Sequence, residues 1–197
     1  MAKKEKSPKA KAKKPEVYTK TENVVVSASL NRELPLERLA ARLENADYNP
    51  ETFPGLILKI ESPKANALLF SSGKVICTGA RNLKEAKAAI AVIVKKIEGI
   101  GLKVGKVPDV EIQNVVASGS VGGKLNLNEI IMKFENTEYD PEQFPGLVYK
   151  PANTHITFLL FGTGKVVITG AKSEKETKEV IWALREELLN AGELREE

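Results

Sequence analysis

The spacing of apolar residues in the first half of the chain predicts four strands and two helices. The segment "NVVVSAS" alternates between its two sides and is rich in β-branched residues, which is typical of a strand. Three more strands are expected in "GLILKIE", "NALLFS" and "KVICTG", the last two joined by a hairpin turn at Ser-Ser-Gly. Apolar residues recur at helical spacing in "PLERLAARLE" and "NLKEAKAAIAVIVKKI", where Asn82 and Glu85 are placed to form a capping box.

The same pattern occurs twice. Residues 23–97 align without a gap to residues 114–188 at a constant offset of 91, and about 30 of the 75 positions are identical. Solenoid repeats span roughly 20 to 50 residues, so this period indicates a duplicated half-domain whose two copies meet across a pseudo-twofold axis. We expect an α+β fold with a mostly antiparallel sheet and the helices on one of its faces.

The chain divides into a basic tail (1–21), a first repeat (22–101), a linker (102–110) and a second repeat (111–192). The tail carries a net charge of +6 and the whole chain +4, so residues 22–197 carry about −2. The tail has few apolar side chains and repels itself, which predicts disorder. It is either a solubilising arm or an arm that binds nucleic-acid phosphates without sequence preference.

Composition narrows the classes of function. Cys77 is the only cysteine and His155 the only histidine, which excludes a disulfide framework and a Cys/His zinc cluster and favours a reducing, intracellular setting. No apolar stretch approaches the roughly 20 residues of a membrane span, and the charged N-terminus is not a signal peptide. The chain lacks a Ser/His/Asp set, a phosphate-binding glycine loop and metal-ligand spacing, so we expect no enzyme activity, no cofactor and no membrane partner.

Alternation within the strands sorts the side chains onto two faces. One face of the first repeat carries Asn23, Val25, Leu68, Phe70, Ile76 and Thr78. Two helices per repeat cover only one side of the sheet, so this nearly uncharged face needs another occupant. A second subunit or a second sheet could bury it, or it forms a concave surface for a large ligand with apolar walls.

The blocks "NVV", "YxPExFPGL" and "LLFxxGKVxxTGA", each present twice at this spacing, resemble the TATA-box-binding protein family over about residues 20–190. The short N-terminal segment resembles the archaeal form. The resemblance implies a saddle made of a ten-stranded curved antiparallel sheet with four helices on its convex face. It also implies a general transcription initiation factor whose concave face binds and bends the minor groove of TATA-box promoter DNA. Its expected partners are that DNA, transcription factor B and, indirectly, RNA polymerase. The resemblance also implies a location in the cytoplasm, associated with the nucleoid, in an archaeal cell, or in the nucleus if the protein is eukaryotic.

The resemblance also assigns roles to individual residues. Paired wedges that enter base steps are Phe53 with Phe70 and Phe144 with Phe161. The apolar floor under the groove consists of Val25, Leu68, Ile76, Val116, Leu159 and Val167. Polar contacts to base edges are expected from Asn23, Thr78, Asn114 and Thr169, and phosphate contacts from Lys59, Lys74, Lys150 and Lys165. The loop that carries the second wedge would bind transcription factor B through Asp140, Glu142 and Gln143, although Asp140 has a second interpretation, as a cap of its own loop.

Two departures and two other functions stay open. Lys59 and Lys150 stand where the family often has arginine, so phosphate contacts at these positions are expected to be less bidentate. His155 stands where the first repeat has Lys64, so a phosphate contact there is expected to be weaker or pH-sensitive. A sequence-neutral architectural DNA-binding protein would use the same face, and so would a saddle that holds a lipid or another ligand. The free protein is expected to form at most a weak homodimer.

Overall fold

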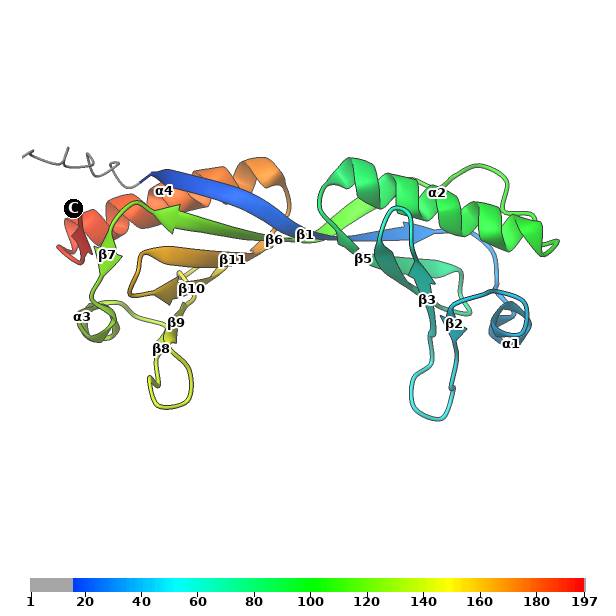
Figure 1. Cartoon of the computed structure of the whole chain (residues 1–197), viewed down its shortest axis with the longest axis horizontal. Coiled ribbons are helices and arrows are strands. Elements are labelled where there is room, and N and C mark those ends of the chain that lie inside the picture. Colours follow the sequence, from blue (N-terminus) through cyan, green and yellow to red (C-terminus); the bar gives the residue numbers. More distant parts are fainter. Residues whose placement is uncertain (1–15, 197) are drawn as a thin grey trace, which may run out of the picture.

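A computed structural model describes residues 16–196 and forms an arch built on one ten-stranded antiparallel sheet (Figure 1). The strand order is β2-β3-β4-β5-β1-β6-β11-β10-β9-β8, so the long strands β1 and β6 meet at the centre. The first repeat contains β1 (Val17–Ser29), β2 (Ala46–Asp47), β3 (Leu56–Ile60), β4 (Ala65–Leu69) and β5 (Lys74–Ala80). The second contains β6 (Val110–Val121), β8 (Thr137–Glu138), β9 (Gly146–Tyr149), β10 (Thr157–Phe161) and β11 (Lys165–Ala171). The predicted fold class is confirmed.

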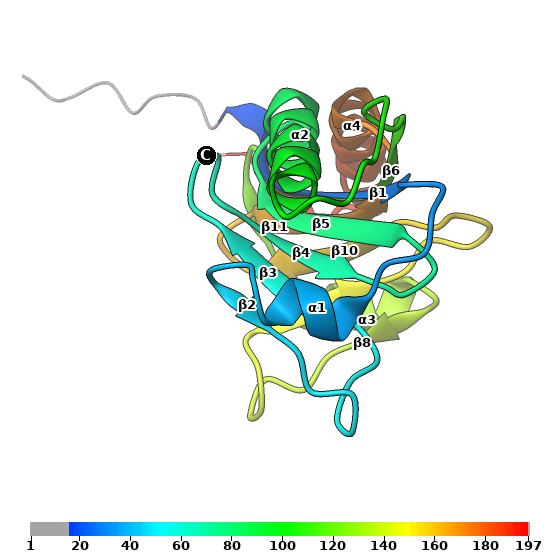
Figure 2. The same cartoon turned by 90° about the vertical axis from the view of Figure 1, so that its right-hand side faces the viewer.

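Four helices cover the convex side of the arch. They are α1 (Leu36–Ala40), α2 (Leu83–Gly99), α3 (Leu127–Lys133) and α4 (Glu174–Asn190). The long helices α2 and α4 lie over the central strands, and α1 and α3 flank the outer strands at the two ends (Figures 1 and 2). Asn82 accepts a hydrogen bond from the backbone N–H of Glu85 at 2.8 Å, and Ser173 accepts one from Glu176 at 3.0 Å. Both predicted N-caps are confirmed, whereas the carboxylates of Glu85 and Glu176 accept from the N–H of Arg81 and Lys172, one residue before each N-cap.

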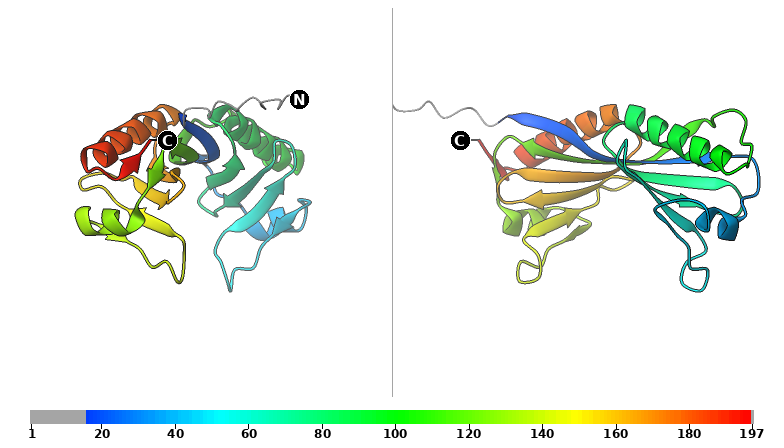
Figure 3. Two further views of the ribbon diagram at one scale, coloured as in Figure 1. Left: turned by 60° about the vertical axis from the view of Figure 1, so that its left-hand side comes forward. Right: turned by 45° about the vertical axis from the view of Figure 1, so that its right-hand side comes forward.

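The hydrophobic core fills the space between the sheet and these helices. Alternate residues of the strands, among them Val24, Val26, Leu69 and Cys77, are fully buried there. The other strand residues face the inner side of the arch, which carries no helix within residues 16–196 (Figure 3). Hence the period-two pattern of the sequence separates core from concave face as predicted. None of the helices in this described range is long and apolar enough to cross a membrane.

One boundary differs from the prediction, and one small sheet is additional to it. β1 begins at Val17, so residues 17–21 belong to the central sheet and not to the tail; residues 1–15 lie outside the described part of the chain. The structure also contains a short second sheet, in which β7 (Lys124–Leu125) pairs with β12 (Leu194–Arg195). Strands of two residues leave no periodic pattern in a sequence, which is why this sheet was not predicted.

Candidate nucleic-acid interface

The floor of the concave face is a continuous apolar surface at the middle of the sheet. In the central pair of strands, Val25 lies opposite Asn114, and Asn23 lies opposite Val116. A rotation about the pseudo-twofold axis exchanges these two pairs. Directly opposed residues of an antiparallel pair share one face. These four side chains are half-buried, because no helix covers them.

Further out, the floor continues across three strands in each repeat. Leu68 of β4 lies between Ile57 of β3 and Ile76 of β5. The matching row of the second repeat consists of Val148, Leu159 and Val167. Ile57 and Val148 were missed from the sequence, although alternation with Lys59 and Lys150 would have placed both on this face.

Each central asparagine is held in a fixed orientation by its own repeat. The Asn23 Oδ1 accepts a hydrogen bond from the Gly79 backbone N–H at 2.7 Å, and its Nδ2 donates to Thr78 Oγ1 at 2.9 Å. In the second repeat the Asn114 Oδ1 accepts from the Gly170 N–H at 2.7 Å, and its Nδ2 lies 3.2 Å from Thr169 Oγ1. An amide nitrogen carries two N–H groups, so each Asn retains one donor that can face a ligand on the floor.

Two pairs of phenylalanines stand at the two ends of the floor. The ring centroids of Phe53 and Phe70 are 6.0 Å apart with the planes at 66°. The centroids of Phe144 and Phe161 are also 6.0 Å apart, at 67°. Edge-to-face packing of this kind stabilises aromatic pairs. Phe144 is nonetheless 46% exposed, so each pair presents apolar surface beyond the floor.

The Phe-Pro-Gly sequence explains how these rings are held. Phe53 and Phe144 lie on the loops between β2 and β3 and between β8 and β9, which project from the ends of the sheet away from α2 and α4 (Figures 1 and 3). Phe70 and Phe161 lie at the ends of β4 and β10. The Phe144 N–H donates to the Asp140 carbonyl at 2.9 Å, which closes the loop. A Cβ on Gly146 would lie 2.6 Å from Phe144 Cε1 and 3.1 Å from Phe161 Cε1. Both rings pack on the backbone of Gly146, where a larger residue would displace them, and Gly55 does the same for Phe53 and Phe70.

The second loop is closed by the side chain of Asp140. Its Oδ1 accepts from the Glu142 N–H at 3.1 Å, and its Oδ2 accepts from Gln143 Nε2 at 2.8 Å. Asn49 makes the first of these contacts in the first repeat, with the Glu51 N–H at 3.1 Å. The capping interpretation thus applies to Asp140, whereas Glu142 and Gln143 remain exposed at the loop tip.

The four predicted lysines are exposed on the rim of the concave face; they are Lys59, Lys74, Lys150 and Lys165. The Lys150 Nζ lies 3.6 Å from Glu138 Oε1, an exposed ion pair that solvent screens. His155 is engaged elsewhere, since its Nε2 lies 2.8 Å from Oε1 of Glu176 at the start of α4. The imidazole of His155 is therefore bound to a carboxylate of its own repeat, at the position where the first repeat has Lys64.

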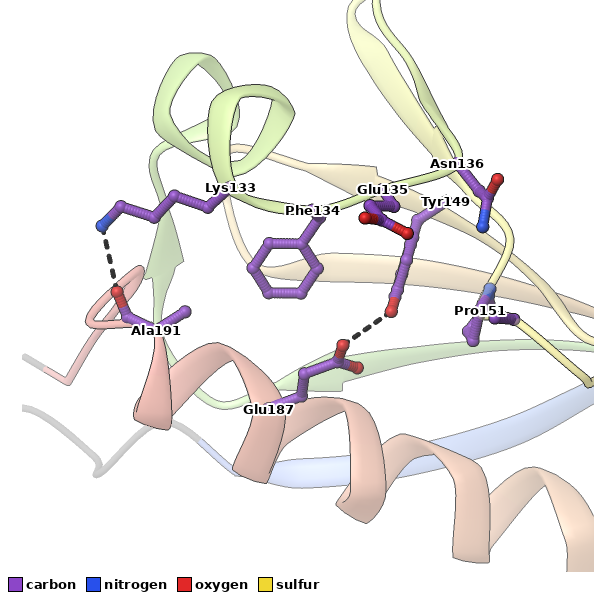
Figure 4. Close-up of a pocket in the computed structure, with 9 residues that line it drawn as sticks. Lys133, Phe134, Glu135, Asn136, Tyr149, Pro151, Glu187 and Ala191 are labelled. Carbon is purple, nitrogen blue, oxygen red and sulfur yellow. Dashed lines mark hydrogen bonds between the residues drawn. The ribbon is translucent and has the colours of Figure 1, made fainter.

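A polar hollow of about 510 Å³ lies on the other side of the sheet, between α3, α4 and β9 (Figure 4). The Tyr149 hydroxyl donates to Glu187 Oε1 at 2.6 Å, and burial, reinforced by this hydrogen bond, raises the pKa of Tyr149. This hollow shares no residue with the concave floor. Within residues 16–196, no cluster of three His, Cys, Asp or Glu side chains could hold a metal ion.

Comparison with known proteins agrees with this geometry. The family described as transcription factor TFIID, or TATA-binding protein, matches residues 19–100 and again residues 109–191. A TATA-box-binding protein of Pyrobaculum neutrophilum is 44% identical over 173 residues, which is 88% of each chain. One from Methanocaldococcus jannaschii is 45% identical over 93% of this chain and 100% of its own.

The solved structure of the Methanococcus jannaschii TBP superposes with a TM-score of 0.80 at 46% identity, and the match covers 85% of this chain and 96% of that one. Two family matches correspond to the two repeats, and both the sequence and the fold agree over most of the chain. The chain belongs to the TATA-binding protein family.

Proposed function

We propose that this protein is a general transcription initiation factor that binds A·T-rich promoter DNA through its concave face. The observation that carries the proposal is the uncovered apolar floor with a phenylalanine pair at each end, to which the two repeats contribute matching positions. The backbone of duplex DNA is itself close to twofold symmetric. A pseudo-twofold protein surface therefore offers the same contacts to both ends of the bound DNA. The family and its named relatives support the promoter as target.

The chemistry of the floor favours the minor groove of A·T sequence. There A·T pairs present only adenine N3 and thymine O2 acceptors, whereas G·C pairs add the guanine N2 amino donor. An apolar floor of Val, Leu and Ile side chains would leave that donor without a partner, which is costly. The free N–H groups of Asn23 and Asn114 lie at the centre, where they can donate to the acceptors.

The two phenylalanine pairs would bend the DNA. Apolar side chains that insert between base steps unstack them and kink the duplex toward the major groove. Each pair is preassembled by edge-to-face packing and by a glycine that fits beneath the rings, so little conformational freedom is lost on binding. The bend of about 80° is the family's known value.

Assembly with protein partners completes the proposed role. Glu142 and Gln143 are exposed at the tip of the second loop, and Asp140 fixes the loop from which they project. An acidic tip beside DNA repels phosphate and favours a basic protein surface. The proposed partner is transcription factor B, which would recruit RNA polymerase in turn.

The main alternative is a sequence-neutral architectural DNA-binding protein, which the +6 charge of residues 1–21 favours. Competition between A·T-rich and G·C-rich duplexes of equal length separates the two functions. A promoter factor should prefer the A·T duplex by about 10³-fold or more at physiological salt, and should bend an end-labelled TATA duplex in a fluorescence energy-transfer assay. Equal affinity for both duplexes would support the architectural function, and no affinity for either would contradict both.

A further inference from the structure

Tyr18 extends the concave face beyond the floor. In the pairing of β1 with β6, Tyr18 lies opposite Ser120, and Ser120 lies opposite Lys165 of β11. Directly opposed residues share one face of the sheet, so Tyr18 and Lys165 belong to the same surface. The preceding Val17 packs on the other side, against the core. Tyr18 is 46% exposed, so its ring stands on the concave side with much of its surface in solvent.

The Tyr18 side chain lines a mostly apolar hollow of about 530 Å³ at the end of the second repeat. Phe161 of the wedge, Pro145 of its loop and Lys165 line the same hollow. Val167 of the floor also reaches it. The hollow is thus continuous with the proposed DNA surface and lies directly beside one wedge.

Lys20 occupies the next row of the same face. It lies opposite Ser118, which lies opposite Val167 of β11. Its side chain is 71% exposed, and its Nζ is 3.5 Å from Glu22 Oε1. An ion pair this exposed is weak, so the ammonium group of Lys20 is available to an anion with little cost.

The opposite end of the face, over the first repeat, has acidic residues at the two matching positions. At the offset of 91, Tyr18 corresponds to Asp109 and Lys20 to Glu111. Glu111 lies opposite Ser27, which lies opposite Ile76, so it faces the concave side as Lys20 does. The two positions together carry +1 at the second-repeat end and −2 at the first-repeat end, a difference of three unit charges.

Nearer the pseudo-twofold axis, the charge difference between the two ends of the concave face has the opposite sign. Glu22 carries a negative charge where Gln113 is neutral, which reduces the overall difference between the two ends from three to two unit charges. The outer rows, where the DNA backbone leaves the saddle, therefore remain the more asymmetric part of the face.

We propose that Tyr18 and Lys20 form a one-sided clamp on the sugar-phosphate backbone, at the second-repeat end of duplex DNA bound on the concave face. The proposal rests on the proposed function. The Tyr18 ring packs on deoxyribose and its hydroxyl donates to phosphate, while Lys20 neutralises phosphate charge. At the other end, Asp109 and Glu111 repel phosphate and leave the flanking backbone without this contact. The saddle therefore holds DNA along a longer stretch at one end than at the other.

The length of the duplex tests this clamp without requiring a known orientation. An A·T-rich core is prepared with no flanking base pairs, with a flank on one end, and with flanks on both ends, and the Kd of each is measured. The wild-type protein can turn its second-repeat end toward a single flank. One flank should therefore give nearly the whole gain in affinity, and the second should add only the statistical factor for two equivalent orientations.

Variants at matched positions sharpen the test. Tyr18→Ala should lose about three- to tenfold of the gain that the first flank gives. Lys20→Glu should lose a similar part and lower the salt dependence of binding, whereas Glu111→Lys should make the second flank as favourable as the first. Met132→Ala, which removes a side chain 81% exposed on α3 of the convex side, is the control and should change no Kd.

The outcomes separate the clamp from the function it rests on. Equal gains from the two flanks in the wild-type protein would overturn the clamp, and so would full retention of the first gain in both Tyr18→Ala and Lys20→Glu. The second result would leave the exposed Tyr18 ring to a protein partner. Failure of the wild-type protein to bind the unflanked A·T core would instead contradict the proposed function itself.

Discussion

The two repeats are most alike at the floor of the concave face and at the phenylalanine pairs, and they differ more in the outer rows of β1 and β6 and on the convex side. Both phenylalanine pairs have centroids 6.0 Å apart, and both central asparagines accept a backbone hydrogen bond at 2.7 Å. By contrast, Tyr149 and Glu187, which bond to each other behind the sheet, correspond to Leu58 and Lys96 in the first repeat. Duplex DNA demands the same chemistry at both ends, whereas the remaining surface is free to differ.

The largest effect is expected from removing one wedge. The double variant Phe144→Ala/Phe161→Ala should lower the bend of a TATA duplex by roughly half, because each pair is proposed to kink one of two base steps. Its effect should be smaller than the sum of the single variants, since both rings act on the same step. Sites with a flexible TA step at that end should suffer least. Energy transfer between dyes on the duplex ends measures the bend.

The matched double variant Phe53→Ala/Phe70→Ala should have the same effect, because the two pairs have the same geometry. A fully bent complex with either double variant would show that these rings are not wedges.

A second difference concerns the loop tips, where only the second repeat is proposed to bind transcription factor B. Glu142→Arg should weaken the ternary complex with that factor by more than about tenfold, because a charge reversal brings like charges together. Binding to DNA alone should change only a few-fold. A gel-shift titration of the factor onto preformed DNA complexes measures both.

Glu51→Arg is the matched control, since Glu51 occupies the same place in the first loop. It should leave the ternary complex intact. Equal weakening by the two variants, or none by either, would place the partner elsewhere.

The central asparagines should be equivalent, with a smaller effect. Asn23→Ala or Asn114→Ala should cost about 1–3 kcal/mol at an A·T site and much less on random DNA. Each also supports the fold, because the Gly79 or Gly170 N–H loses its acceptor. Asn114→Asp keeps that acceptor and removes the amide donor, so it should retain thermal stability and still lose A·T affinity. Equal losses on specific and random DNA would assign the asparagines a structural role alone.

The sequence predicts the sheet well because strand periodicity reports burial directly. Leu69 and Cys77 alternate with Leu68 and Ile76, and the first two are buried while the others face the concave side. The N-terminal part of β1 was missed for the same reason. In "VYTKTE" polar residues occupy both faces, so residues 17–21 resembled the basic tail. Pairing with β6, a partner about 100 residues away, decides their structure.

The sequence identifies which residues form the site but not how they are arranged in space. The repeats identify the floor and the phenylalanines, because duplication at a fixed offset marks positions that one strand alone would not. Their geometry depends on contacts between separate strands, such as Asn23 with Gly79. The rows that join Tyr18 to Lys165 through Ser120 likewise cross three strands. The spacing of residues within a single strand does not reveal how these three strands are aligned with one another.

The smallest expected effect lies beside the pseudo-twofold axis, where Glu22 and Gln113 occupy matching positions. Ser118 Oγ donates to Glu22 Oε1 at 2.6 Å, and Gln113 Nε2 donates to Ser27 Oγ at 2.8 Å. The two hydrogen bonds have similar lengths, but serine is the donor in the first and the acceptor in the second, and only Glu22 is charged. The hydrogen bond from Ser118 is the main cause that lowers the pKa of Glu22, so the carboxylate stays charged at neutral pH.

A carboxylate here repels DNA phosphates and the acceptors of the groove, whereas glutamine can donate to Ser118 as Gln113 does to Ser27. Glu22→Gln should therefore tighten DNA binding by about two- to fivefold, the range of a solvent-screened charge interaction. Gln113→Glu, the matched change in the other repeat, should weaken binding by a similar factor. Both effects should shrink as salt rises, which fluorescence anisotropy at several salt concentrations would measure. Weaker binding by Glu22→Gln at low salt would contradict this prediction, because it would mean that the carboxylate positions Ser118 and does not repel DNA. The two repeats would then differ beside the axis in structure and not only in charge.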